Sequence, residues 1–558
     1  MAKTIIYQVF TRLFGNVKPT CKKNGTILDN GCGKFNDIND AALDGLAELG
    51  VTHVWYTGII RHASVTRYPY QSHPANANVV KGHAGSPYAI CDYFDVDPDL
   101  AVDVDARMDE FMSLVDRTHA HGMKVLIDFV PNHVARNYHS DVRPEEAAQI
   151  GEDDDPTKAY DVNNNFYYLP DKQFVSPVVN HDAPYIEFPA KASGNDAFTA
   201  SPSMNDWYET VKLNYGINPA DGSRNFDPHP DTWYKMRDIL LYWVQTGIDG
   251  FRVDMAEMVP TEFWRWIIMQ VIARHPRIIF VAETYDINQY QNYIAAGFNL
   301  LYDKVNFYDT VRAVMRGEQP ANNVSQIWRK TSDKGTKMLY FLENHDEQRI
   351  ASDFFLGDPW KARPGFMLAL LMGRGGTMIY FGQEIGERGM DEEGFSGRDG
   401  RTTIFDYWSL ELFRKYVGDD HSYDISRLPE EAQKLRIWYA NLLQTIQQFE
   451  SFGYGEMYDL MWVNQSIFVD ASKIFAFLRY TEHERFLVAV NFGDNDVTTS
   501  IRVPEDAWHK MGSTWNECIQ PRDMLGNAVT TYQTSVNIAQ DKGIEMTIPA
   551  NDGILLRI

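Results

Sequence analysis

The feature that most constrains the fold is a regular alternation of short apolar runs with amphipathic helical stretches. Short, nearly continuous apolar runs are typical of strands that are buried on both faces of a parallel sheet. Eight such runs occur, at residues 4–10, 52–57, 123–129, 248–254, 278–283, 299–303, 337–342 and 376–381. Helical periodicity separates them, at 40–49, 105–121, 232–246, 260–274, 360–373 and 430–449. Eight strands alternating with helices predict an α/β fold, a (β/α)8 TIM barrel.

A doubly wound parallel sheet is the alternative for the same alternation. Such a sheet commonly carries a Gly-rich phosphate-binding turn after an early strand. No GxGxxG or GxxxxGK[ST] motif occurs here between a predicted strand and a predicted helix. The barrel is therefore the preferred interpretation.

Two long segments interrupt the alternation, and both follow predicted strands. Residues 134–228 come after the third strand, and ordinary βα loops have only about 2–6 residues, so this segment is predicted to be an inserted, loop-rich domain B. Residues 382–429 form a second long, Gly-rich and charged loop. Both would emerge at the C-terminal face of the barrel, where the active sites of this fold lie.

The pattern changes near residue 451 to short alternating strands, at 473–480, 485–492 and 553–558. Turn-like sequences separate them, which is typical of an antiparallel β-sandwich. We therefore expect a catalytic barrel formed by residues 1–133 and 229–450, an inserted domain at 134–228 and a C-terminal β-sandwich at 451–558. The sandwich shows no obvious exposed Trp pair, so we expect a structural role for it.

Composition excludes several classes of function. The formal charge of −24 disfavours nucleic-acid and membrane-surface partners but not a neutral sugar. No apolar stretch reaches the roughly 20 residues that span a bilayer. The N-terminus lacks the apolar core of a signal peptide, which predicts a cytoplasmic protein, or a secreted or periplasmic one if a native signal was removed.

The four cysteines predict free thiols, with a Cys21–Cys32 disulfide as the alternative. The oligomeric state stays open.

Acidic residues cluster at the ends of the predicted strands. Asp128 ends the third strand, Asp254 the fourth and Glu283 the fifth, and Asp346 follows the seventh. Carboxyl groups that converge in one basin split their pKa values, so one is ionised while another holds a proton. Cleavage of a glycosidic bond needs this pair, with carboxyls about 5 Å apart for retention and about 6.5–9.5 Å apart for inversion. Neighbouring strands lie about 4.8 Å apart, so Asp254 and Glu283 are expected to be close, which favours retention.

Four short motifs carry a family resemblance. DFVPNH (128–133), GFRVD (250–254), VAET (281–284) and ENHD (343–346) resemble the four conserved regions of the α-amylase family, glycoside hydrolase family 13, and occur in the family's order. SPYAICDY (86–93) and IYFGQE (379–384) are also similar to family segments. The resemblance implies a retaining glycosidase acting on α-1,4-glucans such as starch, glycogen or maltodextrins. The alternatives are an α-glucan transglycosylase with the same residues and, more remotely, a non-catalytic carbohydrate-binding or scaffold protein.

The resemblance also implies roles for individual residues. Asp254 resembles the catalytic nucleophile, Glu283 the general acid/base, and Asp346 the third carboxylate of the family. Asp128 would be structural and close to the site. The residues that the resemblance implies for substrate binding are Tyr88, His133, Arg252 and His345.

Two departures from the family pattern concern specificity and metal. Many α-amylases have Lys and His where this chain has Glu257 and Met258, and WYETVKLNYG (207–216) has no clear match to the family's motif near the end of the inserted domain. The chemistry needs no cofactor. Members of the family often bind structural Ca2+ through an Asn at the position of Asn132, and calcium stays open here. DVNNN (161–165) begins like a calcium loop, but no Gly or Glu completes it.

Overall fold

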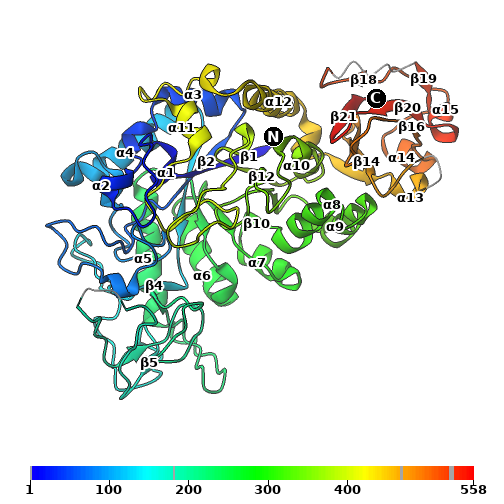
Figure 1. Cartoon of the computed structure of the whole chain (residues 1–558). Helices are drawn as coiled ribbons and strands as arrows, with labels where there is room; N and C mark the ends of the chain where they lie inside the picture. Colours follow the sequence, from blue (N-terminus) through cyan, green and yellow to red (C-terminus); the bar gives the residue numbers. More distant parts are fainter. Residues whose placement is uncertain (1–2, 180–182, 466–468, 527–532) are drawn as a thin grey trace.

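A closed parallel barrel forms the centre of the molecule (Figure 1). The computed structural model describes residues 3–179, 183–465, 469–526 and 533–558. Around the barrel the strands follow the order of the chain, and the last pairs with the first, Thr4 aligning with Gly376. The predicted TIM barrel is confirmed. Its strands are β1 (Thr4–Phe10), β2 (His53–Thr57), β3 (Lys124–Phe129), β8 (Gly250–Val253), β9 (Ile279–Ala282), β10 (Leu300–Tyr302), β11 (Met338–Tyr340) and β12 (Gly376–Tyr380).

Both faces of the barrel strands are buried, which explains their nearly continuous apolar sequence. Side chains alternate between the two faces of a strand. One set packs into a compact cluster within the barrel, and the other joins the large core that extends under the helices. The cluster within the barrel includes Ile6, Trp55, Leu126, Val281, Leu339 and Met378.

Helices surround the barrel, and several of them bury one stripe. In α4 (Arg107–Ala120) the buried positions are Phe111, Leu114, Val115 and Thr118, a spacing that lies on one helical face. The remaining longer helices are α3 (Asp40–Glu48), α5 (Asp231–Gln245), α6 (Thr261–Ile272), α7 (Tyr290–Ala296), α8 (Asp309–Met315), α9 (Val324–Thr331), α10 (Arg363–Leu371), α11 (Glu411–Val417) and α12 (Glu430–Gln447).

The segment between β3 and α5 extends from one end of the barrel, at the lower left of Figure 1. It contains two short antiparallel pairs, β4 (His133–Ala135) with β7 (Thr210–Lys212) and β5 (Tyr168–Leu169) with β6 (Ala190–Lys191). Buried polar contacts support its loops: Arg136 forms an ion pair with Glu187 at 2.7 Å. The β4–β7 pair begins four residues after β3, so the insertion is joined directly to the end of a barrel strand.

The C-terminal part is antiparallel and lies at the other end of the molecule (Figure 1). Its main sheet has the order β13 (Glu456–Asp459), β14 (Ile474–Tyr480), β15 (Arg485–Asn491), β21 (Asp552–Arg557) and β18 (Arg522–Asp523). A second pair joins β16 (Val497–Ile501) to β20 (Ile544–Ile548). The predicted antiparallel C-terminal domain is confirmed.

One buried arginine joins this domain to the barrel. Arg479 in β14 is fully buried and donates hydrogen bonds to the carbonyl oxygens of Leu371, Met372 and Gly373, where α10 ends. It also donates to the carbonyl oxygens of Ser451 and Gly455. These acceptors include the carbonyl groups that a helix C-terminus leaves without an intrahelical partner.

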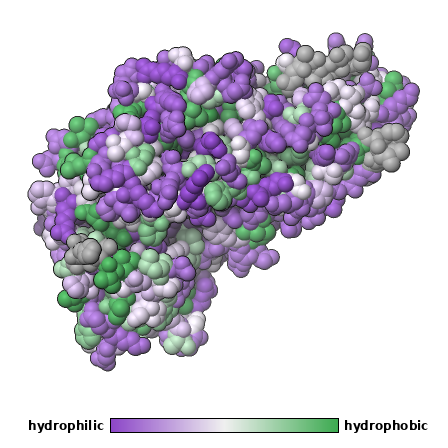
Figure 2. All heavy atoms as spheres, viewed as in Figure 1, coloured by the Kyte–Doolittle hydropathy of each residue, from purple (hydrophilic) through white to green (hydrophobic). Residues whose placement is uncertain are grey.

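The visible surface is mostly hydrophilic, with small scattered apolar patches (Figure 2). That surface agrees with an acidic chain of net charge −24. None of the described helices is long and apolar enough to cross a membrane. The four cysteines are free, as predicted.

Candidate active site

The barrel register brings two of the predicted acids together. Val253 of β8 aligns with Ala282 of β9, so the next residues, Asp254 and Glu283, are neighbours at the C-terminal ends of adjacent strands. The main chain continues this pairing, because the amide of Glu283 donates to the carbonyl oxygen of Val253 at 3.0 Å. Glycine is required at position 250, where a Cβ would lie 2.4 Å from the carbonyl oxygen of Ile279.

A single guanidinium group contacts three carboxylates at this end of the barrel. Nη1 of the buried Arg252 donates to Oδ1 of Asp254 at 3.0 Å, and Nη2 lies 2.9 Å from Oε2 of Glu283. Oδ1 of Asp128 is 3.5 Å from Nη1. Three aromatic rings surround this guanidinium at 5.1–5.5 Å, from Trp55, Tyr88 and Tyr302. Charges this deeply buried persist only when they are paired and hydrogen-bonded.

The two adjacent carboxyls have unequal surroundings. Glu283 accepts hydrogen bonds from the hydroxyl of Tyr285 at 2.7 Å and from the amide of Met255 at 2.8 Å. Oδ2 of Asp254 is buried and has no hydrogen-bond partner among the described residues. Burial, and then the charge of Glu283, raise the pKa of Asp254 well above its ordinary value. The raised pKa favours the protonated form of Asp254 in the absence of a ligand.

Asp346 reaches the same pocket from the loop after β11. Burial acts to raise the pKa of Asp346, but the adjoining His345 ring and Arg252 outweigh burial and leave that pKa below its ordinary value. His345 Nε2 lies 3.0 Å from Oδ2 of Asp346 and 2.6 Å from the hydroxyl of Tyr88. Nδ1 of the same ring contacts Gln8 in β1 at 2.8 Å. This network fixes the orientation of the His345 ring.

Of two further predicted residues, one lies at the edge of the site and the other lies beneath it. His133 begins β4, and burial, followed by the charges of Lys212 and Lys81, lowers its pKa to about 3, so its ring is neutral. Asp128 instead lies beneath the site, where Oδ2 accepts hydrogen bonds from Trp55 Nε1 at 3.1 Å and from the amide of Gly58 at 3.4 Å.

The carboxyl groups open into a cavity of about 380 Å3. Five of the residues singled out from the sequence line it: Tyr88, His133, Asp254, Glu283 and Asp346. The lining residues that sequence reasoning missed are Lys81, Ser86, Trp207, Glu209, Thr210, Met255, Tyr285, Ile404 and Phe405. Trp207 and Glu209 belong to the segment 207–216, which had no assigned role, and Tyr285 directly follows the VAET motif.

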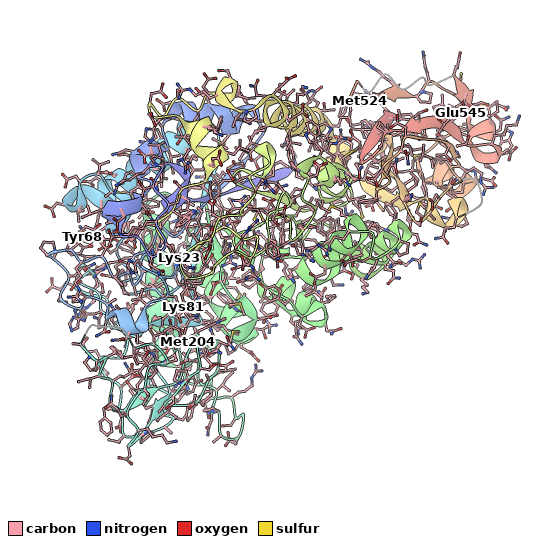
Figure 3. All side chains as sticks on the ribbon, viewed as in Figure 1. Lys23, Tyr68, Lys81, Met204, Met524 and Glu545 are labelled. Carbon is pink, nitrogen blue, oxygen red and sulfur yellow. The ribbon has the colours of Figure 1, made fainter. Side chains whose placement is uncertain are left out.

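A buried ion pair closes part of this cavity. Lys81 Nζ, from the loop after β2, lies 3.0 Å from Oε1 of Glu209 in the inserted segment, and both side chains are nearly buried. Figure 3 places Lys81 where the insertion meets the barrel. Oε2 of Glu209 is also buried and, within the described parts of the chain, accepts no hydrogen bond. A buried carboxylate oxygen without a hydrogen-bond partner is uncommon, and Glu209 is one of the residues that line the cavity.

A lysine occupies the position where the family resemblance places calcium. Oδ1 of Asn132 accepts a hydrogen bond from Nζ of the buried Lys212, which also lies 2.9 Å from Oδ1 of Asp196 and 3.4 Å from the carbonyl oxygen of Met258. Ca2+ requires 6–8 oxygen ligands, and here an ammonium group is bound to the oxygens that would supply them. An adjacent divalent cation would be repelled at low dielectric. The residues present therefore do not fit calcium at Asn132.

The DVNNN segment is also bound to lysines. Asp161 Oδ2 lies 2.7 Å from Lys158 Nζ, and Asn165 Oδ1 accepts a hydrogen bond from Lys235 at 2.8 Å.

Glu257, which stands where many α-amylases have Lys, has a structural role. Its Oε2 accepts hydrogen bonds from the amides of Tyr285 and Asp286 at 2.9 and 3.1 Å. Glu257 thus holds the loop that carries Tyr285.

Comparisons with known proteins find similar sequences and similar folds. Residues 8–415 match the family model for the α-amylase catalytic domain, and residues 468–558 match the model for the α-amylase C-terminal all-beta domain. The chain is 24% identical over 412 residues to a cyclomaltodextrin glucanotransferase of a Bacillus species, covering 68% of this chain and 49% of that protein. It is 23% identical to an α-amylase of Haloarcula japonica, covering 90% and 57%. The chain thus spans about half the length of these curated relatives.

Solved structures share the fold. A Geobacillus thermoleovorans α-amylase complexed with acarbose has a TM-score of 0.66 at 17% identity, covering 100% of this chain and 98% of that one. A maltogenic α-amylase from Thermotoga neapolitana has a TM-score of 0.62 at 20% identity, with the same coverage.

Because Lys212 is bound to Asn132, we expect that calcium does not change the stability of the protein. Reversing the charge at position 212 should make stability depend on calcium. We expect the parent protein to melt at the same temperature in calcium and in chelator. Lys212→Asp places a second carboxylate beside Asp196 and should make stability depend on calcium, with a gain of about 2.7 kcal/mol when free calcium reaches a hundred times its Kd. Thermal unfolding measures this. Lys330→Asp at an exposed position of α9 is the matched control, and a parent that loses stability in chelator would contradict the assignment.

Proposed function

Because this chain belongs to the α-amylase family, we propose that it is a retaining glycosidase that hydrolyses α-1,4-glucans such as starch, glycogen or maltodextrins. The observation that carries the proposal is the contact of Arg252 with both Asp254 and Glu283, at 3.0 and 2.9 Å. Two carboxyls held by one guanidinium lie close together, and short separation favours a covalent intermediate over direct attack by water.

In the proposed first step, Asp254 attacks the anomeric carbon while Glu283 donates its proton to the departing glycosidic oxygen. The bond between that carbon and the leaving oxygen breaks, and a glycosyl ester forms on Asp254. Arg252 stabilises Asp254 as a carboxylate during the attack. In the second step Glu283 takes a proton from water, which displaces Asp254 and restores the original configuration.

Asp254 must be ionised and Glu283 must carry a proton when the reaction begins. Without substrate, the raised pKa of Asp254 favours its protonated form. A bound sugar reverses this preference: developing positive charge at its anomeric carbon favours ionised Asp254, and developing negative charge on the leaving oxygen draws the proton from Glu283. Asp346, with its lowered pKa, stays ionised and accepts hydrogen bonds from sugar hydroxyls.

The volume of the pocket favours a substrate of few sugar units. Its volume of about 380 Å3 lies near the lower end of the roughly 300–1,000 Å3 typical of small-molecule sites. The Lys81–Glu209 pair supplies charged hydrogen-bonding groups at one wall, and Trp207 supplies an aromatic face. Aromatic faces and fixed polar groups together suit a hydroxylated ring.

Transglycosylation is the second candidate, supported by the apolar groups beside the acid/base. Met255 and Tyr285, which both donate hydrogen bonds to Glu283, line the pocket, as do Ile404 and Phe405. A sugar stacked on such groups would compete with water for the same glycosyl-enzyme. Several relatives are named cyclomaltodextrin glucanotransferases.

Removing the nucleophile's charge tests the proposal directly. Asp254→Asn should lower the release of reducing sugar from maltodextrin by about 10⁴-fold or more, the scale of loss when a catalytic nucleophile is removed. Asp249→Asn is the matched control, since Asp249 precedes the same strand at the opposite end of the barrel and contacts His119. We expect the control to keep activity within about twofold. Undiminished release by Asp254→Asn would refute the assignment.

The raised pKa of Asp254 predicts the acid limb of the pH profile. At low pH Asp254 is protonated and cannot attack, so kcat/KM should fall as the pH decreases through that raised pKa. The midpoint is expected above the roughly 3.9 of an unperturbed Asp. A profile of kcat/KM against pH with a short maltooligosaccharide measures it, and a midpoint below pH 4 would contradict the description of the pair.

Maltotriose distinguishes hydrolysis from transfer. A hydrolase should convert it to glucose and maltose, because water alone intercepts the glycosyl-enzyme. Chromatography of early products is the measurement. If maltotetraose or longer products were the main early species, the principal activity would be transglycosylation and not hydrolysis.

A further inference from the structure

A cluster of two histidines and an aspartate lies outside the catalytic pocket. Among the described residues, His73, His139 and Asp141 form a group whose ligand atoms all lie within 4.8 Å of one another. His73 belongs to the loop after β2, whereas His139 and Asp141 open the inserted segment after β4. The two imidazole rings have centroids 4.0 Å apart and are tilted by 38°, and Nε2 of His139 is 3.9 Å from Oδ1 of Asp141.

We propose that His73, His139 and Asp141 form a binding site for a divalent transition-metal ion of the zinc class. Two imidazole nitrogens and one carboxylate oxygen, with water as a fourth ligand, suit Zn2+ in tetrahedral geometry. The same set is poor for Ca2+ and Mg2+, which prefer oxygen. A tetrahedral site needs ligand atoms about 3.3 Å apart, given bonds of about 2.0–2.1 Å. Rotation of the exposed His73 side chain can supply that adjustment.

The other ring nitrogens are held by polar neighbours. Nδ1 of His73 lies 2.8 Å from the hydroxyl of Ser72, which donates to Oδ1 of Asp141. That hydroxyl therefore accepts from Nδ1–H and leaves the Nε2 lone pair free. Nδ1 of His139 lies 2.7 Å from the side-chain amide of Gln149, whose oxygen can accept Nδ1–H once the amide is turned. Metal-binding histidines are usually held in this way.

The backbone around the cluster is fixed before any ion binds. The side chain of Asn137 donates to the carbonyl oxygen of His73 at 2.9 Å. The amide of His139 donates to the carbonyl oxygen of Cys91, and that of Asp141 to Oδ2 of Asp92, each at 2.9 Å. The barrel loop and the insertion are therefore already joined, so binding needs little reorganisation.

Local charge also favours a cation. Oδ2 of Asp141 pairs with the buried Arg61 at 2.9 Å, while Oδ1 points to the histidines. Asp92 and Asp95 lie within 4.0 Å of the same guanidinium, and Arg107 pairs with Asp95. Three carboxylates and two arginines leave one negative charge in excess. A bound ion would join the loop that carries Lys81 and Tyr88 to the insertion that carries His139.

Zinc titration of the untagged, chelator-treated full chain tests the site. We expect one Zn2+ per chain by calorimetry, together with a rise in melting temperature, and no competition from Ca2+. His73→Asn and His139→Asn keep a polar group near the Nδ1 position and remove the ligand nitrogen. Each substitution should lower the affinity for zinc at least by the 10- to 100-fold that follows the loss of a residue that holds a metal ligand in place.

The matched control is His119→Asn, because His119 is a partly exposed histidine that pairs with Asp249 and belongs to no group of three possible metal ligands among the described residues. Zinc affinity should be unchanged in this variant. The proposal fails if the parent shows no saturable binding, or if the double variant His73→Asn/His139→Asn binds zinc as the parent does. Near-ultraviolet circular dichroism of the metal-free variants confirms that their fold is intact, so a loss of affinity reports the site itself.

Discussion

The guanidinium of Arg252 is the interaction on which the site depends. Its position in β8 places it among Asp128, Asp254 and Glu283 at the C-terminal ends of three neighbouring strands. Three carboxylates in a dry basin would repel one another and take up protons. The single buried cation limits this repulsion. The aromatic rings of Trp55, Tyr88 and Tyr302 exclude water and stabilise the cation in place.

The same principle recurs elsewhere in this acidic chain. Basic residues are outnumbered, 52 to 76, yet several are buried where oxygen atoms converge. Lys212 is bound to Asn132, Asp196 and Met258, and Arg479 to carbonyl oxygens of the barrel and of the C-terminal domain. Internal ammonium and guanidinium groups thus join the insertion and the C-terminal domain to the barrel. At Asn132 such a group replaces the divalent ion that the family resemblance suggested.

The proposed catalytic residues and the residues that line the pocket come from different kinds of structure. Asp254 and Glu283 directly follow rigid strands, so the hydrogen-bond register determines their separation. The walls of the pocket come from loops and the insertion, as with Lys81, Trp207 and Glu209. Chemistry in this arrangement depends on the barrel, whereas the size and polarity of the bound molecule depend on the loops.

The sequence by itself determined the barrel and the acids at its strand ends. Burial of both strand faces requires continuous apolar runs, and these are visible without any tertiary information. The motifs at 250–254 and 281–284 singled out Asp254 and Glu283 because each motif covers the end of one strand and the residue that follows it. Only the tertiary structure decided which groups surround them. Glu209 pairs with Lys81 across 128 positions of the chain, and Asn132 meets Lys212 rather than an ion. The periodicity of apolar residues in the sequence does not indicate such contacts, because they depend on how two loops fold over the end of one strand.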